Sequence, residues 1–269
     1  MTYWKLRNRF LPGIMNCQQV YEHFLMGYLD ERTIWLDLGC GHTLLHQGGE
    51  DKSSELVHKT KLVVGVDLDL NALFMNRILQ HRVGGDLESL PFRDGSFSLV
   101  TCNMVIEHAV NPECLVKEIE RILRPEGVAI IHTPNLFHWE VLLSYLTPHK
   151  LHEIFCWFLD ARSSNDVYRV FYRANTSSRL NDLFRLVAMT RHRGGPVTNA
   201  PRRFPIPFLS GLLTLASIVE VKFLSHQFFS PLRHNLLLSF RKSASSLPKM
   251  VLDGKGYADC KMVHEEQAP

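Results

Sequence analysis

A short apolar segment that ends in an acid and two closely spaced glycines constrains this chain more than any other feature. Residues 34–38 (IWLDL) are nearly all apolar, as expected for a strand that is buried on both faces of a parallel sheet. Gly39 and Gly41 follow directly, and glycine permits positive φ and a close approach of the backbone to a ligand. In open α/β sheets such turns, at the carboxyl ends of strands, are where nucleotide-like ligands bind.

The residues around this turn exclude the common phosphate-binding motifs. The P-loop spacing with its lysine is absent from the chain. A dinucleotide-binding turn would prefer a glycine three residues after Gly41, where this chain has Leu44. A pyrophosphate would also be poorly matched to a turn that carries Asp37 and has no neighbouring Lys or Arg.

Two further acids end the next two apolar segments. Asp67 closes residues 62–67 (LVVGVD), where a carboxylate is suited to accept both hydroxyls of a ribose, and Asp86 follows Gly84-Gly85. Carboxylates that converge on one cleft favour a cationic ligand without phosphate, because like charges in a low-dielectric site must be offset. S-adenosylmethionine, with its sulfonium and ammonium groups, is such a ligand.

The order and spacing of these motifs resemble one enzyme family. The segments that carry the resemblance are Asp37-x-Gly39-x-Gly41, Val64-Gly65-Val66-Asp67, Asp86, Leu90-Pro91-Phe92-Arg93-Asp94-Gly95-Ser96-Phe97, Glu107-His108, Asn111-Pro112 and Glu118-x-x-Arg121-x-Leu123-Arg124-Pro125. The chain is similar, from about residue 33 to 135, to the class I S-adenosylmethionine-dependent methyltransferases and to their type 11 small-molecule branch. It departs from the family at Thr43, where a third glycine is frequent, at Ser98, where Asp is usual, and at Glu126, where Gly-Gly is usual.

The resemblance implies an α/β fold of the Rossmann-like, three-layer α/β/α methyltransferase type. Its mostly parallel seven-stranded sheet would have the last strand antiparallel. It also implies S-adenosylmethionine as cofactor, with contacts from Asp37, Gly39, Cys40, Gly41, Asp67, Leu68, Asp86, Leu87 and Asn103. In this scheme Asp86 and Leu87 lie against the adenine, and Asn103 contacts the methionine moiety. An alternative for Asp86 is an acid that caps a turn.

His108 is the candidate catalytic residue. A histidine with an ordinary pKa of about 6.5 can take a proton from an acceptor hydroxyl at neutral pH. The alternative is a structural histidine that holds the loop at Asn111-Pro112. No enzyme nucleophile is required for methyl transfer, so Cys40 and Cys102 are interpreted as packing residues.

The remaining patterns predict further elements. Helices are expected over residues 70–80, from Pro112 to Leu123 after an Asn111 cap, and from Thr176 to Leu186, with Lys117, Glu118, Glu120 and Arg121 on a solvated face. Strands are expected to end at Asp86 and over residues 97–102, 128–132, 187–192 and 235–241. His132, His138, His149 and His152 lack a compact ligand spacing, so no metal site is predicted.

The predicted organisation is one methyltransferase domain with additions. A helical lead-in spans residues 1–32, the domain spans 33–242 with an acceptor-side cap (136–175) and an insertion (194–233), and a flexible tail spans 243–269. The lead-in is interpreted as a helix packed on the sheet edge or as a flap over the ligands. Within the insertion, residues 204–224 contain an uninterrupted apolar core that is too short to span a bilayer, which needs about 20 residues. They are expected to be buried against the domain or a second copy, or to form an interfacial helix that delivers a lipid-linked acceptor.

The function expected from these features is S-adenosylmethionine-dependent methyl transfer to oxygen of a small-molecule, sugar or lipid-linked acceptor. The alternatives are carbon methylation of a quinone-like or lipid acceptor, a non-catalytic S-adenosylmethionine-binding module, and a nucleotide-dependent oxidoreductase. The net charge of +3 does not favour nucleic acid as a partner. The six cysteines form no C-x-x-C pair and the basic N-terminus precedes no apolar core, so a cytoplasmic protein is predicted, with peripheral contact to the inner face of a membrane as an option.

Overall fold

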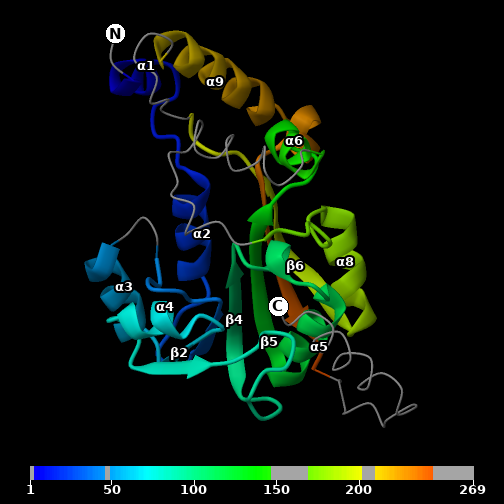
Figure 1. The fold of residues 1–269 in the computed structure, drawn as a ribbon. Helices are drawn as coiled ribbons and strands as arrows, with labels where there is room; N and C mark the ends of the chain where they lie inside the picture. The colour runs from blue at the N-terminus through cyan, green and yellow to red at the C-terminus, as the bar shows by residue number, and fades with distance from the viewer. Residues whose placement is uncertain (1–2, 46–48, 147–168, 202–209, 245–269) are drawn as a thin grey trace.

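A seven-stranded sheet forms the centre of the computed structural model, which describes residues 3–45, 49–146, 169–201 and 210–244 (Figure 1). The strands are β1 (Ile34–Leu38), β2 (Leu62–Asp67), β3 (His81–Gly84), β4 (Phe97–Asn103), β5 (Leu123–Pro134), β6 (Met189–Val197) and β7 (Asn235–Lys242). Their order is β3-β2-β1-β4-β5-β7-β6. The pairs from β3 to β5 are parallel, and β7 is antiparallel to both β5 and β6. The predicted sheet, with its last strand antiparallel, is therefore confirmed.

Helices cover both faces of the sheet, as Figure 1 shows. On one face lie α2 (Cys17–Met26), α3 (Gly49–His58) and α4 (Leu70–Met75), and on the other lie α5 (Pro112–Ile122) and α8 (Ser177–Leu186). Because neighbouring side chains of a strand point to opposite faces, Trp35 packs with α2 and α3 whereas Leu36 packs with α5 and α8. This arrangement accounts for the unbroken apolar run of β1, since both of its faces are buried.

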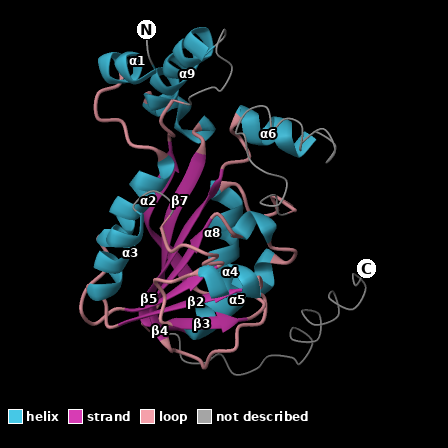
Figure 2. Cartoon of the chain, turned by 60° about the vertical axis from the view of Figure 1, so that its left-hand side comes forward, coloured by secondary structure: helices cyan, strands magenta, loops and turns pink. Residues whose placement is uncertain are grey.

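A separate group of helices lies beyond the carboxyl end of β5, at the top of Figures 1 and 2. It consists of α1 (Tyr3–Phe10), α6 (Trp139–Leu146), α9 (Ser210–Ser225) and the 3-10 segment η3 (Gln227–Leu232). Helix α9 packs against α1 and η3. In the part of the chain that the structure describes, no helix is both long enough and apolar enough to cross a membrane.

Several helix ends lie where the sequence predicts them. The Asn111 side chain accepts a hydrogen bond from Cys114 N at the start of α5, and Pro112 occupies the first turn. Thr176 caps α8 by accepting from Arg179 N at 3.2 Å. The flexible tail predicted over 243–269 lies outside the described residues from Ser245 onward.

Helix α4 is shorter than predicted because Asn76 ends it. Asn76 has an extended ψ of 100°, and its side chain accepts from Leu79 N and donates to the carbonyl of Gly41. Leu70 and Phe74 of this segment are exposed, while Leu73 and Leu79 are buried. The prediction of a helix to residue 80 is therefore wrong, and the helix's end is tied to the glycine turn instead.

The prediction that Glu118 and Arg121 belong to a solvated face of α5 is also wrong. Glu118 is buried and accepts from Leu90 N at 2.7 Å, and Arg121 donates to the carbonyls of Leu90 and Phe92 and to Asp94. The two side chains also pair with each other at 2.7 Å. This network holds the loop between β3 and β4 on α5, and helical periodicity alone does not reveal such a partner.

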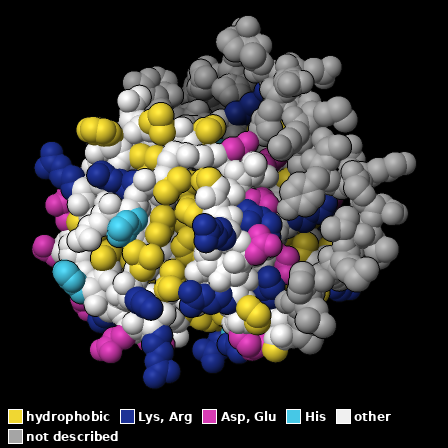
Figure 3. Space-filling model, turned by 90° about the horizontal axis from the view of Figure 1, so that it is seen from below, with side chains coloured by type: hydrophobic (Ala, Val, Ile, Leu, Met, Phe, Trp, Pro, Cys, Tyr) yellow, Lys and Arg dark blue, Asp and Glu magenta, His cyan; other side chains and the backbone are white. Residues whose placement is uncertain are grey.

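The end of the molecule opposite α1 and α9 has a mixed surface (Figure 3). Basic, acidic and apolar side chains are interspersed on this face.

Candidate cofactor site at the carboxyl end of the sheet

Asp37, in strand β1, is buried, and its carboxylate accepts a hydrogen bond from a hydroxyl of the neighbouring strand β4. Asp37 and Thr101 are partners in the strand register, and Thr101 Oγ1 donates to Asp37 Oδ1 at 2.5 Å. Trp35 Nε1 donates in turn to Thr101 Oγ1 at 2.6 Å, which leaves the hydroxyl proton for Asp37. Burial raises the pKa of Asp37 to about 7, with a further increase from repulsion by Asp67 and a partial offset from the Thr101 hydrogen bond.

The glycine turn after β1 is wrapped against the end of β2. Gly39 N and Cys40 N both donate to the carbonyl of Val66, at 2.8 and 3.2 Å, and Gly41 N donates to Asp67 Oδ2 at 2.8 Å. Gly39 and Gly41 have φ of +64° and +50°, a conformation that other residues rarely adopt. A β-carbon on Gly39 would lie 2.5 Å from a methyl group of Val105, whereas a β-carbon on Gly41 would meet nothing within 4 Å. Gly39 is thus required by close packing, and Gly41 leaves open space beside the turn.

The carboxylate of Asp67 is oriented by backbone groups from both turns. Besides Gly41 N, it accepts from Asp69 N at 2.9 Å through Oδ1. Leu68, which stands between Asp67 and Asp69 in the chain, is 74% exposed. Asp37 and Asp67 therefore belong to one site, as the repulsion between them also indicates.

Asp86 caps the turn that follows β3. Its Oδ1 accepts from Glu88 N at 2.9 Å, and its carbonyl accepts from Ser89 N. This contact agrees with the alternative of a turn-capping acid, and it leaves the adenine contact of Asp86 and Leu87 as a prediction. Leu87 is half-buried and packs on the core cluster that includes α5 and α8.

Asn103, at the end of β4, connects helix α2 to strand β5. It donates from Nδ2 to Gln18 Oε1 at 3.1 Å, and its Oδ1 lies 2.7 Å from His132 Nδ1. The ring of Tyr21 stacks on His132, with centroids 5.5 Å apart. Met104, the next residue along the chain, has φ of +58°, an unusual conformation that clusters at functional sites.

The sequence did not identify Gln18, Tyr21 and His132 as neighbours of Asn103. Helix α2 packs its Tyr21 and Leu25 on the sheet face and presents Gln18 to the strand ends. Helix α2 of the lead-in is thus packed on the sheet, and the flap over the ligands stays a prediction. No local pattern marks these contacts, because Gln18 and Asn103 are 85 positions apart.

His108 lies in the short segment η1 (Ile106–His108), next to the backbone of residue 169. Its Nδ1 is 2.8 Å from the carbonyl of Arg169, which fixes the ring proton on Nδ1. Burial lowers the pKa of His108 below its ordinary value, and the carbonyl opposes that shift. The contact joins η1 to residue 169 and not to the loop at Asn111-Pro112 that the structural alternative named, and it gives Nε2 the lone pair that a base needs. The catalytic role of His108 stays a prediction.

Glu107, beside His108, is a buried acid whose role the sequence did not predict. It accepts from Thr133 Oγ1 at 2.8 Å, and Asn175 Nδ2 donates to the same hydroxyl at 2.7 Å. Burial raises the pKa of Glu107 to about 7, although hydrogen bonds to its carboxylate partly offset this effect. The Glu107 side chain thus points into the core toward Thr133, and the His108 ring points toward the carbonyl of Arg169.

The described residues suit a cationic ligand at this edge of the sheet. Among them, no Lys or Arg forms an ion pair with Asp37 or Asp67. Two carboxylates without a cationic partner, beside open space at Gly41, match a ligand that brings its own positive charge.

Comparison with known proteins agrees with this site. Residues 36–131 match the model of a methyltransferase domain family. A Mycolicibacterium smegmatis protein named "Probable S-adenosylmethionine-dependent methyltransferase" is 34% identical over 103 residues, which is 37% of this chain and 37% of that protein. The ubiquinone biosynthesis O-methyltransferase of an Azoarcus species is 29% identical over 37% of this chain and 43% of its own length. The match therefore spans less than half the length of these curated relatives.

The fold has solved counterparts across most of the chain. A chain in the complex of the Haloferax volcanii Trm112 methyltransferase activator with a methyltransferase has a TM-score of 0.55 and 18% identity, covering 90% of this chain and 93% of its own. The strand order, the acids at the ends of β1 and β2 and the family match over residues 36–131 lead to one conclusion. Residues 36–131 are similar to the methyltransferase domains of S-adenosylmethionine-dependent enzymes.

Proposed function

We propose that the protein transfers a methyl group from S-adenosylmethionine to an oxygen of a small-molecule, sugar or lipid-linked acceptor. The observation that carries the proposal is the pair of acids, Asp37 and Asp67, at a glycine turn without a cationic partner among the described residues. When bound, S-adenosylmethionine supplies a methyl group on a positively charged sulfur, which an acceptor oxygen attacks as its proton leaves.

In this proposal the residues of the turn bind and orient the cofactor. Asp67 accepts the ribose hydroxyls, Asp37 offsets the positive charge, and the backbone from Gly39 to Gly41 packs against the ligand. Leu68, Asp86 and Leu87 surround the adenine side, and Asn103 contacts the methionine side. Most of the rate enhancement would come from positioning the acceptor in line with the methyl group and from excluding water.

His108 is the proposed base for a hydroxyl acceptor. Its lowered pKa keeps the ring neutral at neutral pH, and the Arg169 carbonyl directs the basic lone pair to Nε2. A proton accepted there would leave the acceptor oxygen as the nucleophile.

Two observations support an apolar or lipid-linked acceptor. Helix α6, which follows the carboxyl end of β5, exposes Trp139, Leu142, Leu143, Tyr145 and Leu146. Helix α9, which lies at the same end of the molecule in Figures 1 and 2, carries further exposed apolar side chains, so these helices offer nonpolar surface. The relative named for ubiquinone biosynthesis is an O-methyltransferase by name, which favours oxygen over carbon as the methylated atom.

Cofactor binding is tested by isothermal titration with S-adenosylmethionine, S-adenosylhomocysteine, NAD and NADP. Asp67→Asn keeps one oxygen for the backbone amides and loses the charge, so it is expected to weaken binding of both adenosyl ligands at least about tenfold. Asp182→Asn, on the exposed side of α8, is the matched control and should bind as the unmodified protein does. Binding of a dinucleotide instead of the adenosyl ligands would contradict the proposal.

Methyl transfer is tested with isotope-labelled S-adenosylmethionine and fractions of polar metabolites, sugars and lipid extracts. The expected product carries the label on oxygen, as nuclear magnetic resonance would establish, and His108→Gln should lower kcat more than it changes KM. Label on carbon would favour the quinone-like alternative. Tight cofactor binding without turnover on any fraction would favour a binding module.

A further inference from the structure

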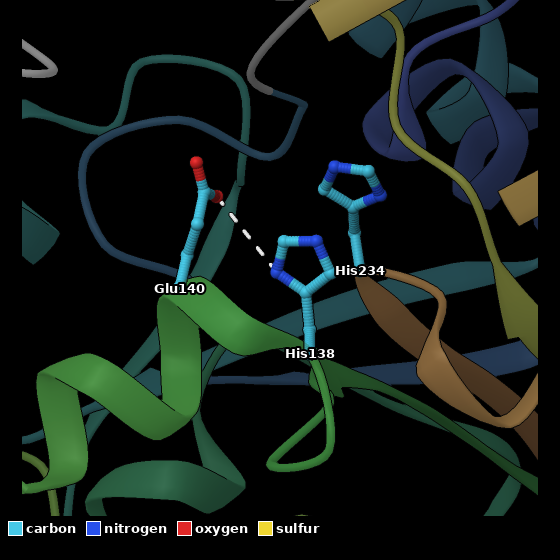
Figure 4. Close-up of side chains that lie close together, drawn as sticks. All are labelled: His138, Glu140 and His234. Carbon is cyan, nitrogen blue, oxygen red and sulfur yellow. Dashed lines mark ion pairs between the residues drawn. The ribbon is translucent and has the colours of Figure 1, made fainter. Parts of the chain in front are cut away.

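Two histidines and two glutamates meet where the cap joins the sheet, away from the glycine turn. His138 precedes α6, Glu140 lies in its first turn, His234 precedes β7, and Glu220 belongs to α9. The rings of His138 and His234 are stacked, with centroids 4.0 Å apart and planes 26° apart. Both histidines are buried, and Figure 4 shows His138 between Glu140 and His234.

His138 faces a carboxylate at each of its ring nitrogens. Nε2 is 3.2 Å from Glu220 Oε1, which also accepts from Trp139 Nε1 at 2.5 Å. Nδ1 points toward Glu140 Oε2 at 3.8 Å, the contact marked in Figure 4. A neutral imidazole has a single N–H, so if Nε2 donates to Glu220, the lone pair of Nδ1 faces a negatively charged oxygen.

A cation between these atoms would turn that repulsion into attraction. The candidate donor atoms of His138, Glu140 and His234 all lie within 4.8 Å of one another. Ligands at about 2.0–2.1 Å from a tetrahedral ion are about 3.3 Å apart, so closing the set needs movements of about 1.5 Å or less. Glu140, at the start of a helix, can supply such a movement by rotation of its side chain. Asn199 N donates to His234 Nδ1 at 3.3 Å, and ion binding would break this contact whichever nitrogen of His234 is the ligand.

We propose that His138, His234 and Glu140 bind one divalent transition-metal ion of the zinc class, with Glu220 orienting the ring of His138. Two imidazoles and a carboxylate are a donor set that suits zinc, and three protein ligands leave a fourth position for water. A carboxylate that accepts from the far nitrogen of a ligating histidine is the usual support outside such a site. The ion would link the start of α6 to the start of β7, and Glu220 would connect this site to α9.

The spacing of the histidines along the chain could not indicate this site. The spacing of His138 from His132, His149 and His152 along the chain is not compact, so no metal site was predicted. The partner in the structure is His234, which is 96 positions away and reaches His138 because β7 pairs with β5. We therefore replace that expectation with the proposal of a metal site.

The test uses the full chain, freed of metal with a chelator and then titrated with Zn²⁺ or Co²⁺. We expect one equivalent of ion per chain, visible absorption bands typical of tetrahedral Co²⁺, and an increase in thermal stability on loading. His234→Ala and Glu140→Gln should each weaken Zn²⁺ binding more than about 100-fold, and Glu220→Gln by roughly 10- to 100-fold. His23→Ala and Glu31→Gln, both at exposed positions, are matched controls that should bind normally.

Circular dichroism of the metal-free proteins shows whether each variant folds. If His234→Ala does not fold, Glu140→Gln supplies the same test, because it changes a half-buried side chain without loss of volume. The proposal is overturned if the chain binds no stoichiometric ion, or if binding survives both ligand substitutions. Titration with S-adenosylhomocysteine in parallel separates this outcome from a failure of the cofactor site.

Discussion

Gly39 shows how one residue can join a turn to a neighbouring loop. It combines positive φ with a close approach to Val105, whereas Gly95 has a similar φ of +61° and open space around it. A side chain at either position would strain the left-handed backbone, but only at Gly39 would it also meet a packed neighbour.

Gly39→Ala should therefore destabilise the fold more than the matched variant Gly95→Ala. We expect a loss of about 1–2 kcal/mol for Gly95→Ala from the backbone conformation alone, and about 1–3 kcal/mol more for Gly39→Ala from the contact with Val105. Urea unfolding measures both values. Equal losses of stability for the two variants would show that the Val105 side chain can move away from the added methyl group at no cost in free energy.

The raised pKa of Asp37 makes the stability of the cofactor-free protein depend on pH. The unfolded chain releases this proton near the ordinary pKa of 3.8, and the folded protein releases it near 7, so the folded state binds more protons between these values. The free energy of unfolding should consequently fall as pH rises from about 4 to about 7, and Asp37 should add no further slope above that. Glu107, whose pKa is also about 7, adds a slope of the same sign.

Urea unfolding at pH 5 and pH 8 tests this dependence in the unmodified protein and in Asp37→Asn. The amide cannot ionise, so the variant should gain stability relative to the unmodified protein at pH 8 compared with pH 5. Comparing the two proteins cancels the contribution of Glu107. A difference that does not change with pH would mean that Asp37 is ionised in the folded protein at both values.

At the scale of elements, α5 holds the loop that carries the family's Leu-Pro-Phe segment. Arg121 donates to two loop carbonyls and to two carboxylates, a geometry that a planar guanidinium can satisfy and an ammonium cannot. Neighbouring charges accordingly raise the pKa of Arg121 above its ordinary value, led by the hydrogen bond with Glu118. The residue thus acts as a clamp between a helix and a loop.

Arg121→Lys should destabilise the protein by about 1–3 kcal/mol, because Leu90 and Phe92 lose their donors in a half-buried setting. Arg185→Lys is the control, since its ion pair with Asp182 is exposed and should contribute less than about 1 kcal/mol. Chemical denaturation gives the stabilities, and hydrogen exchange at Leu90 N reports on the loop. Unchanged exchange at that amide would contradict the clamp.

At the scale of the whole molecule, the two ends differ in what they expose. Helix α9 buries one face, with Thr214, Ser217, Ile218, Val221 and Leu224, and exposes Leu212, Leu215, Val219 and Phe223 on the other. Apolar side chains thus lie on both faces of the helix, whereas a helix with one face in water would expose mainly polar ones. The helix is therefore only partly buried, although burial was the favoured prediction for residues 204–224, of which 204–209 lie outside the described residues.

If this surface meets a membrane that holds a lipid-linked acceptor, Val219→Glu and Phe223→Glu should each weaken binding to phospholipid vesicles about tenfold. Val219 is exposed, so thermal stability of its variant should stay the same, whereas Phe223 also stacks on Phe229 and its variant should lose some stability. Leu186→Glu, at an exposed apolar position of α8, is the control. Cosedimentation with vesicles measures the binding, and equal binding of all four proteins would remove α9 from the contact.

Local patterns in the chain were enough to predict the buried strand β1, the acids at the ends of β1 and β2, and the caps of α5 and α8, whereas the seven-stranded sheet was predicted from the family resemblance. The alternation of buried faces, the conformations of glycine and the hydrogen bonds of capping side chains all act over a few residues, so the sequence records them. The neighbours of Asn103, the clamp of Arg121 and the meeting of His138 with His234 became visible in the folded molecule alone. Each of these contacts joins residues that strand pairing or helix packing brings together. The number of positions between two residues in the sequence does not indicate whether such packing places them in contact.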